Sequence, residues 1–299
     1  MPNTEINGIN LYYEIHGSGF PLLFVHGGFG GLGTGVGSGA PAWLGKFTDD
    51  FEVILYDRRS SGRSGYSEET HSMSQFASDI QQLLVHLGHD CAHIWGTSAG
   101  GPISLTFGFE HPHAARSLVI SDSAPWLSRD ADLLSALRRR IEILEKDGPD
   151  AAYQARRNEG TVGLDLFAAN RSPTHPTAAS PDPPPKEERT QTPTGADAIR
   201  AQLANVPRAE RIAKYAGELR TYRAYLDWDG SEPFRQLSMP AMVLYGTEDR
   251  VFPDAGWEQL CAGKHEVTYR AYPGVGHGLT ARAPHAIDEI HAFLLANSP

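Results

Sequence analysis

The chain has 299 residues, about twice the size of a common domain, and its 26 basic and 36 acidic side chains give a net charge of −10. Apolar residues make up 40% and charged residues 21% of the chain, which is typical of a globular protein and excludes a disordered or collagen-like one. The acidic balance, with no Lys or Arg before Lys46, argues against a nucleic-acid partner.

The sequence offers no membrane anchor and no disulfide framework. Its apolar runs, such as residues 21–25, are far shorter than the ~18 residues of a membrane span. Residues 1–10 lack both the cationic and the apolar part of a signal peptide. The two cysteines, Cys91 and Cys261, lie far apart in the chain and suit a reducing compartment. We therefore expect a soluble cytoplasmic protein with no membrane partner, and the sequence leaves a homo-oligomer open.

The first 124 residues predict short strands followed by a regular alternation of strands and helices. The hydrophobic patterns indicate strands at residues 4–9, 10–16, 21–25, 51–56, 92–95 and 117–121, and helices at residues 74–87 and 98–109. Strand, helix, strand in this order favours a parallel sheet with right-handed crossovers. The sequence thus predicts an α/β fold.

The alternation stops near residue 124 and resumes near residue 239, so the segment between is an insertion. It contains an amphipathic helix at 130–146, a helical stretch at 196–228 that breaks before Pro207, and between them residues 171–195, with 7 of the 21 prolines. We expect that proline-rich stretch to be a long loop. The domains are then a core in two parts, 1–124 and 238–299, with a helical cap at 125–237. The second part adds strands at 240–245 and 266–272 and helices at 254–262 and 284–296.

Residues Gly96-Thr97-Ser98-Ala99-Gly100 match the pattern G-x-S-x-G. An apolar strand leads into this pattern and an apolar helix follows it, which is the setting of a nucleophile elbow: small flanking residues allow the serine a strained backbone that exposes its hydroxyl. The alternative for Ser98 is an ordinary helix N-cap.

A serine hydroxyl needs a base, and the base needs an acid that orients it. His277 lies in a glycine-flanked loop between a predicted strand and the last helix, and Asp249 directly follows the strand before it. Both would stand at the carboxyl end of a strand, where open α/β sheets place their sites. The competing acid is Asp122, after the strand at 117–121.

Acyl transfer also needs donors for a developing oxyanion. The run His26-Gly27-Gly28-Phe29-Gly30 follows a buried strand, and its backbone N–H groups can turn inward. The backbone N–H groups of Phe29 and Ala99 form the expected pair, with Gly28 as the alternative to Phe29.

Together with Asp57-Arg58-Arg59-Ser60-Ser61-Gly62-Arg63-Ser64 after the fourth strand, these motifs resemble the capped α/β-hydrolases of the esterase, epoxide hydrolase and proline iminopeptidase group. The resemblance implies an eight-stranded, mostly parallel sheet with helices on both faces and an inserted helical cap. It also implies hydrolysis of an ester, lactone, amide or thioester, because a serine nucleophile attacks a carbonyl, whereas the relatives that open epoxides carry aspartate there. This chain departs from the family at Ser60, where glycine is usual, and in a longer glycine-rich loop at 30–39.

Three other functions compete with this one. Gly28-Phe29-Gly30-Gly31-Leu32-Gly33 fits the dinucleotide pattern G-x-G-x-x-G, but no helix opens within those glycines. A cluster of His86, His89, Cys91 and His93 has ligand-like spacing, yet it lies at a helix end on the side of the sheet opposite the elbow. A non-catalytic receptor with the same fold would not need Ser98, Asp249 and His277 together. The sequence therefore predicts no metal and no cofactor, and a small-molecule acyl substrate as partner.

The insertion should wall the substrate pocket, and its aromatic residues are candidate lining. The candidates are Trp126, Tyr153, Phe167, Tyr222, Tyr225 and Trp228.

Overall fold

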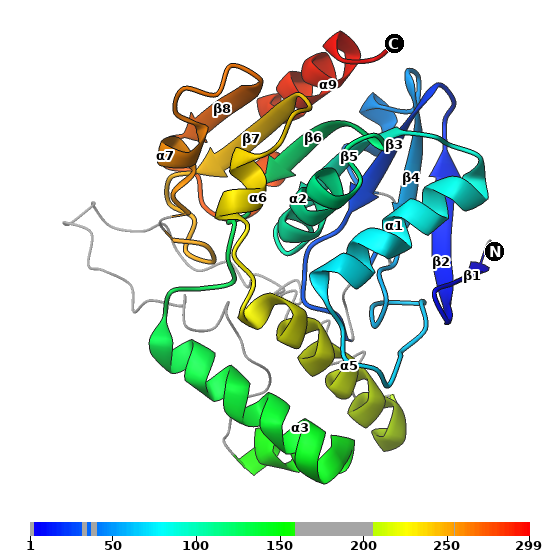
Figure 1. Ribbon diagram of the computed structural model, residues 1–299, viewed down its shortest axis with the longest axis vertical. Helices are drawn as coiled ribbons and strands as arrows, with labels where there is room; N and C mark the ends of the chain where they lie inside the picture. The colour runs from blue at the N-terminus through cyan, green and yellow to red at the C-terminus, as the bar shows by residue number, and fades with distance from the viewer. Residues whose placement is uncertain (1–2, 32–34, 37–40, 159–205, 254) are drawn as a thin grey trace, which may run out of the picture.

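The computed structural model describes residues 3–31, 35–36, 41–158, 206–253 and 255–299. These residues form an eight-stranded sheet in the order β1-β2-β4-β3-β5-β6-β7-β8 (Figure 1). The strands are β1 Asn3–Ile6, β2 Ile9–His16, β3 Phe20–Val25, β4 Phe51–Tyr56, β5 Ala92–Thr97, β6 Ala115–Ser121, β7 Ala241–Gly246 and β8 Val267–Tyr272. The pairings β1–β2 and β2–β4 are antiparallel and the remaining pairings are parallel. The predicted α/β sheet is confirmed.

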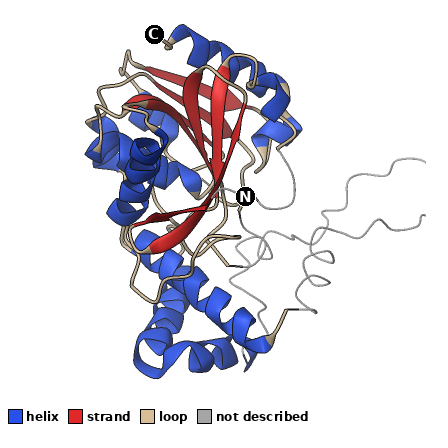
Figure 2. Cartoon of the chain, turned by 90° about the vertical axis from the view of Figure 1, so that its right-hand side faces the viewer, coloured by secondary structure: helices blue, strands red, loops and turns tan. Residues whose placement is uncertain are grey.

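Helices cover both faces of the sheet, as Figure 2 shows. The helices are α1 Met73–Leu87, α2 Gly100–Glu110, α3 Ala131–Asn158, α5 Arg208–Leu226, α6 Ser231–Arg235, α7 Trp257–Cys261, α8 Leu279–Arg282 and α9 His285–Ala296, with a 3₁₀ turn η1 at Leu44–Lys46. One apolar core includes α1 and α2, and a second includes η1 and α9 on the other side. Strands β3 and β7 consist of apolar residues and glycine because both of their faces are buried. No described helix is long and apolar enough to cross a membrane.

The first hairpin turns two residues earlier than the sequence pattern predicted. Asn7 and Gly8 both have positive φ, 47° and 75°, and Ile6 pairs directly with Ile9. A two-residue turn with two positive φ angles matches the twist of the flanking strands, and Asn-Gly suits it. The predicted first strand at 4–9 was therefore wrong at its end, because it ran through this turn.

Helices α3 and α5 of the inserted segment pack against each other and lie beyond one end of the sheet (Figure 1). The first helical part of α3 ends close to the predicted end at residue 146, because Gly148, with φ 88° and ψ 176°, leaves the helical conformation ahead of Pro149, and a second helical part follows. The break predicted before Pro207 is the N-terminus of α5. The predicted loop at 171–195 and the first part of the helical stretch at 196–228 lie outside the described residues.

The short helices were the least predictable elements. The helix predicted at 254–262 begins only at Trp257, after Gly256 in a left-handed conformation. Helices α6 and α8 were not predicted, because segments of four or five residues are too short to show a helical repeat of apolar side chains.

Candidate active site

Ser98 lies on the sharp turn between β5 and α2, with a positive φ of 52°. Its backbone N–H donates to the carbonyl of Ser121 at 2.9 Å. A Cβ atom on Gly100 would lie 2.1 Å from the carbonyl oxygen of Val25, and one on Gly96 would lie 2.3 Å from Ser104 Oγ. The glycines of the pattern are therefore required by close packing. The N-cap of α2 is Ala99, so the alternative of Ser98 as the N-cap is wrong.

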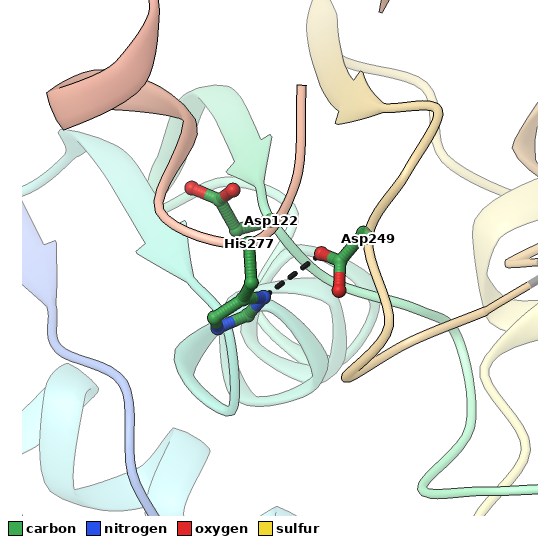
Figure 3. Close-up of side chains that lie close together, drawn as sticks. All are labelled: Asp122, Asp249 and His277. Carbon is green, nitrogen blue, oxygen red and sulfur yellow. Dashed lines mark hydrogen bonds and ion pairs between the residues drawn. The ribbon is translucent and has the colours of Figure 1, made fainter. Parts of the chain in front are cut away.

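His277 and Asp249 complete a chain of hydrogen bonds with Ser98. His277 Nε2 lies 3.1 Å from Ser98 Oγ. Its Nδ1 lies 2.8 Å from Asp249 Oδ2, the contact that Figure 3 shows as a dashed line. Because an ionised carboxylate only accepts hydrogen bonds, this network assigns the ring proton to Nδ1 and leaves Nε2 as an acceptor for the serine hydroxyl. The three residues follow β5, β7 and β8 and meet at the carboxyl ends of these strands, as the sequence predicted.

Asp249 is held by its own loop. Its side chain is fully buried, and Oδ1 accepts the backbone N–H groups of Val251 at 2.8 Å and Phe252 at 3.0 Å. These bonds leave Oδ2 for His277. An acceptor fixed in this way can hold the imidazole in one orientation.

The side chain of the competing acid, Asp122, also contacts the loop that carries His277, but it binds the backbone of that loop. It accepts the N–H groups of Gly278 at 3.0 Å and Leu279 at 2.7 Å. Burial raises the pKa of Asp122, and ligand atoms of Asp122, Asp249 and His277 lie within 4.8 Å of one another. Asp122 thus lies beside the imidazole (Figure 3), with its carboxylate hydrogen-bonded to the backbone of the same loop.

The loop after β3 approaches the serine from the other side. A Cβ atom on Gly27 would lie 2.9 Å from Ser98 Cβ, so this loop packs directly against the nucleophile. Gly28 and Gly30 have φ angles of 79° and 88°, which suit glycine. Between described residues, no hydrogen bond uses the backbone N–H groups of Gly28, Phe29 or Ala99. The three candidate oxyanion donors are therefore open to a substrate oxygen as far as the described chain is concerned.

Asp57 has a structural role that differs from the one a dinucleotide site would require. In such a site it would bind a ribose, but here it is buried and accepts the backbone N–H groups of Val36 at 2.6 Å and Arg63 at 2.8 Å. In the described part of the chain, the first helical turn after the glycines is η1. The carboxylate thus binds Val36 to the chain after β4 and is occupied by these backbone donors, which is a different role from ribose binding.

The histidine and cysteine cluster does not gather around a common point. His89 pairs with Glu52, and His93 contacts Ser117 at 2.7 Å and Ser298 at 3.1 Å. His86 contacts Thr4 and Tyr13. Among the described residues, the grouping at Asp122, Asp249 and His277 is the one that brings three such ligand atoms together. The three histidines of the cluster thus make separate structural contacts.

The predicted lining residues take different positions. Tyr222 of α5 stacks on Phe29, with ring centroids 4.4 Å apart and planes at 17°. Tyr225 meets Phe29 edge to face and donates its hydroxyl to the carbonyl of Ala99. Trp126 and Trp228 are half-buried, and Arg129 lies 3.9 Å from the Trp126 ring. Tyr153 meets Tyr215, and Phe167 lies outside the described residues. Tyr222 and Tyr225 thus adjoin the candidate oxyanion loop.

Residues 21–280 match the family model described as alpha/beta hydrolase fold. The chain belongs to this family. It is 25% identical to a protein of Azorhizobium caulinodans named carbamate hydrolase RutD, over 97% of this chain and 96% of the relative. It is 23% identical to a non-heme haloperoxidase of Rhodococcus erythropolis, over 98% of this chain and 97% of the relative. The enol-lactonase of Burkholderia xenovorans LB400 has the same fold, with a TM-score of 0.67 and 17% identity over 98% of this hydrolase and 100% of the lactonase.

Proposed function

We propose that this hydrolase cleaves a carboxylic ester or a related acyl bond of a small molecule through an acyl-enzyme on Ser98. Ser98 Oγ attacks the carbonyl carbon while its proton passes to His277 Nε2, and the carbonyl electron pair moves to the oxygen. The tetrahedral intermediate collapses as His277 protonates the leaving group. Water, deprotonated by the same imidazole, then attacks the acyl carbon, and the imidazolium returns the proton to Ser98 Oγ as the bond to the acyl group breaks and the acid leaves.

The observation that carries this proposal is the continuous chain from Ser98 Oγ through His277 to the buried Asp249. The positive φ of Ser98 supports it, because such strain at a buried turn is maintained where the hydroxyl must point out of the sheet. Asp249 would hold the tautomer and stabilise the imidazolium that forms during each step.

Contacts of the inserted segment with the site support its assignment as a cap. Its helix α5 contacts Phe29 through Tyr222 and Ala99 through Tyr225. We therefore assign residues 125–237 to the cap and residues 1–124 and 238–299 to the core, and we place Tyr222, Tyr225, Trp126 and Trp228 at the substrate-facing side.

A panel of substrates tests the reaction class. It contains p-nitrophenyl esters, lactones, aminoacyl anilides and, because of the relatives' names, an aryl carbamate. We expect turnover of at least one class by the wild-type protein and loss of that turnover in Ser98→Ala. If neither protein turns over any class while the wild type binds the same molecules, the chain is a receptor and the proposal fails.

A further inference from the structure

Each candidate oxyanion donor belongs to a peptide group whose carbonyl oxygen accepts a hydrogen bond from a buried side chain. The N–H of Phe29 shares its peptide group with the carbonyl of Gly28, which accepts from Arg58 Nη2. The N–H of Ala99 shares its peptide group with the carbonyl of Ser98, which accepts from Ser123 Oγ at 2.7 Å. The same arrangement therefore occurs on both sides of the site.

Arg58 also binds the peptide group of the alternative oxyanion donor, the N–H of Gly28. Its Nη2 also donates to the carbonyl of Gly27 at 3.2 Å, and that carbonyl shares a peptide group with the N–H of Gly28. Its Nη1 donates to the hydroxyl of Tyr225 at 3.2 Å. The side chain is almost fully buried, with 1% of its surface exposed. The guanidinium is thus fixed behind the loop, whichever of the two N–H groups faces the substrate.

His26 completes the support of this loop. Its Nε2 accepts the backbone N–H of Arg58 at 3.2 Å, so its Nδ1 carries the proton and donates to the carbonyl of Gly27 at 2.7 Å. Burial and the neighbouring Arg58 hold the pKa of His26 well below its usual range. The ring therefore stays neutral, and this arrangement of donors is kept across the pH range of activity measurements.

A hydrogen bond to a carbonyl polarises its peptide group and strengthens the bond that the N–H of the same group can donate. The effect is larger when the donor is charged, as Arg58 is. We propose that Arg58 and Ser123 are positioning residues of the oxyanion hole, which orient and polarise the two peptide groups whose N–H groups receive the developing charge. This inference rests on the proposed function, since it requires an oxyanion formed by attack of Ser98.

The charge on the carbonyl oxygen is larger in the transition state than in the bound substrate. Groups that strengthen the oxyanion donors should therefore affect kcat more than KM. Removing a direct oxyanion donor costs on the order of 10² to 10³ in kcat. We expect about tenfold for each positioning residue, because the N–H group itself remains.

The test compares Ser123→Ala and Arg58→Met with the wild type and with a matched control. The control is Thr106→Val, which removes a buried hydroxyl in α2 that donates to the carbonyl of Pro102 at 2.9 Å. With p-nitrophenyl acetate, we expect Ser123→Ala and Arg58→Met each to lose about tenfold in kcat with KM changed less than about twofold. Thr106→Val should have the kcat and KM of the wild type.

An inhibitor pair separates this role from a general loosening of the fold. A trifluoromethyl ketone adds to Ser98 Oγ and leaves an oxyanion on its former carbonyl, whereas the matching methyl ketone binds without adding. We expect both variants to bind the trifluoromethyl ketone about tenfold more weakly and the methyl ketone as the wild type does. A merely structural role would weaken both ketones.

The inference is overturned if the wild type is active and the kcat of Ser123→Ala differs from that of the wild type no more than the kcat of Thr106→Val does. Ser123→Ala alone decides the matter if Arg58→Met does not fold. A wild type that neither cleaves the panel nor is inhibited by the trifluoromethyl ketone would overturn the proposed function, and this inference with it.

Discussion

Two carboxylates reach the loop that carries His277, but they do so differently. Asp249 contacts the ring nitrogen Nδ1, while Asp122 accepts two backbone N–H groups of the following residues. Asp249 can therefore stabilise the imidazolium directly. Asp122 positions the loop.

The substitution Asp249→Asn should lose on the order of 10³ to 10⁴ in kcat, because an amide can present the wrong hydrogen-bonding pattern to the ring. Asp122→Asn is the matched control. Its amide oxygen can still accept from Gly278 and Leu279, so its loss should be much smaller. The measurement is steady-state kinetics of both variants with one ester. The reverse ranking would make Asp122 the triad acid.

At the residue level, the sequence predicted Ser98, Asp249 and His277 because each follows a recognisable strand in a short motif. It did not predict the role of Arg58 or Ser123, although both lie close to recognised motifs. Their function depends on which carbonyl each donor meets across neighbouring strands, and spacing along one chain does not contain that information. Ser60 adopts a φ of 55° where glycine is usual, and the absence of a side chain on the facing Gly217 leaves room for it.

At the scale of the elements, the nucleophile elbow packs closely against β3. A Cβ on Gly100 would approach backbone atoms of β3 and the loop after it, whereas one on Gly45 would meet nothing within 4 Å. Neither the β3 backbone nor the α2 backbone can move without disturbing the sheet.

Gly100→Ala should therefore lower the free energy of unfolding by about 3 kcal/mol or more, through overpacking and backbone displacement. The control Gly45→Ala should change it by less than about 0.5 kcal/mol. Urea unfolding of the two variants measures both values. Equal stability of Gly100→Ala and Gly45→Ala would show that the elbow has room that the structure does not contain.

Helix α5 contains a carboxylate that titrates in an unusual range. Burial raises the pKa of Glu218 from 4.5 to about 6, although Arg156 and Arg140 lower it in part. The folded protein therefore binds this proton more tightly than the unfolded chain does. The wild type should gain stability relative to Glu218→Gln as the pH falls from about 6 to about 4.5.

The difference in unfolding free energy between the wild type and Glu218→Gln should change by about 2 kcal/mol between pH 7.5 and pH 4. Urea unfolding at several pH values measures it. Glu142→Gln is the control, because Glu142 is exposed and Lys146 lowers its pKa. A pH-independent difference for Glu218→Gln would mean that the carboxylate is solvated in the folded protein.

Among the helices, the long ones were predictable from the sequence and the short ones were not. Helix α1 begins within one residue of its predicted start, with Ser72 accepting the N–H of Gln75 and Gly88 ending the helix in a left-handed conformation. In α3, Gly148 leaves the helical conformation close to the predicted end at residue 146, and a second helical part begins at Pro149.

Across the whole molecule, the site depends on joining two distant parts of the chain. Strands β6 and β7 pair in parallel although the inserted segment separates them, and this pairing brings the Ser98 and His277 loops together. The alternation of strands and helices on both sides of the insertion predicted that residues 1–124 and 238–299 form one core. The contacts of α5 with Phe29 and Ala99 were not predictable, because they join residues far apart in the chain whose pairing no local pattern specifies.

Covalent labelling of Ser98 tests the proposed nucleophile most directly. Wild-type protein treated with a fluorophosphonate and digested should carry one adduct, on the peptide that contains Ser98, with loss of activity in proportion to labelling. Ser98→Ala should keep the wild-type melting temperature, take up no label and lose on the order of 10⁶ in kcat. Labelling of another residue, or active protein that takes up no label, would contradict the assignment of Ser98 as the nucleophile.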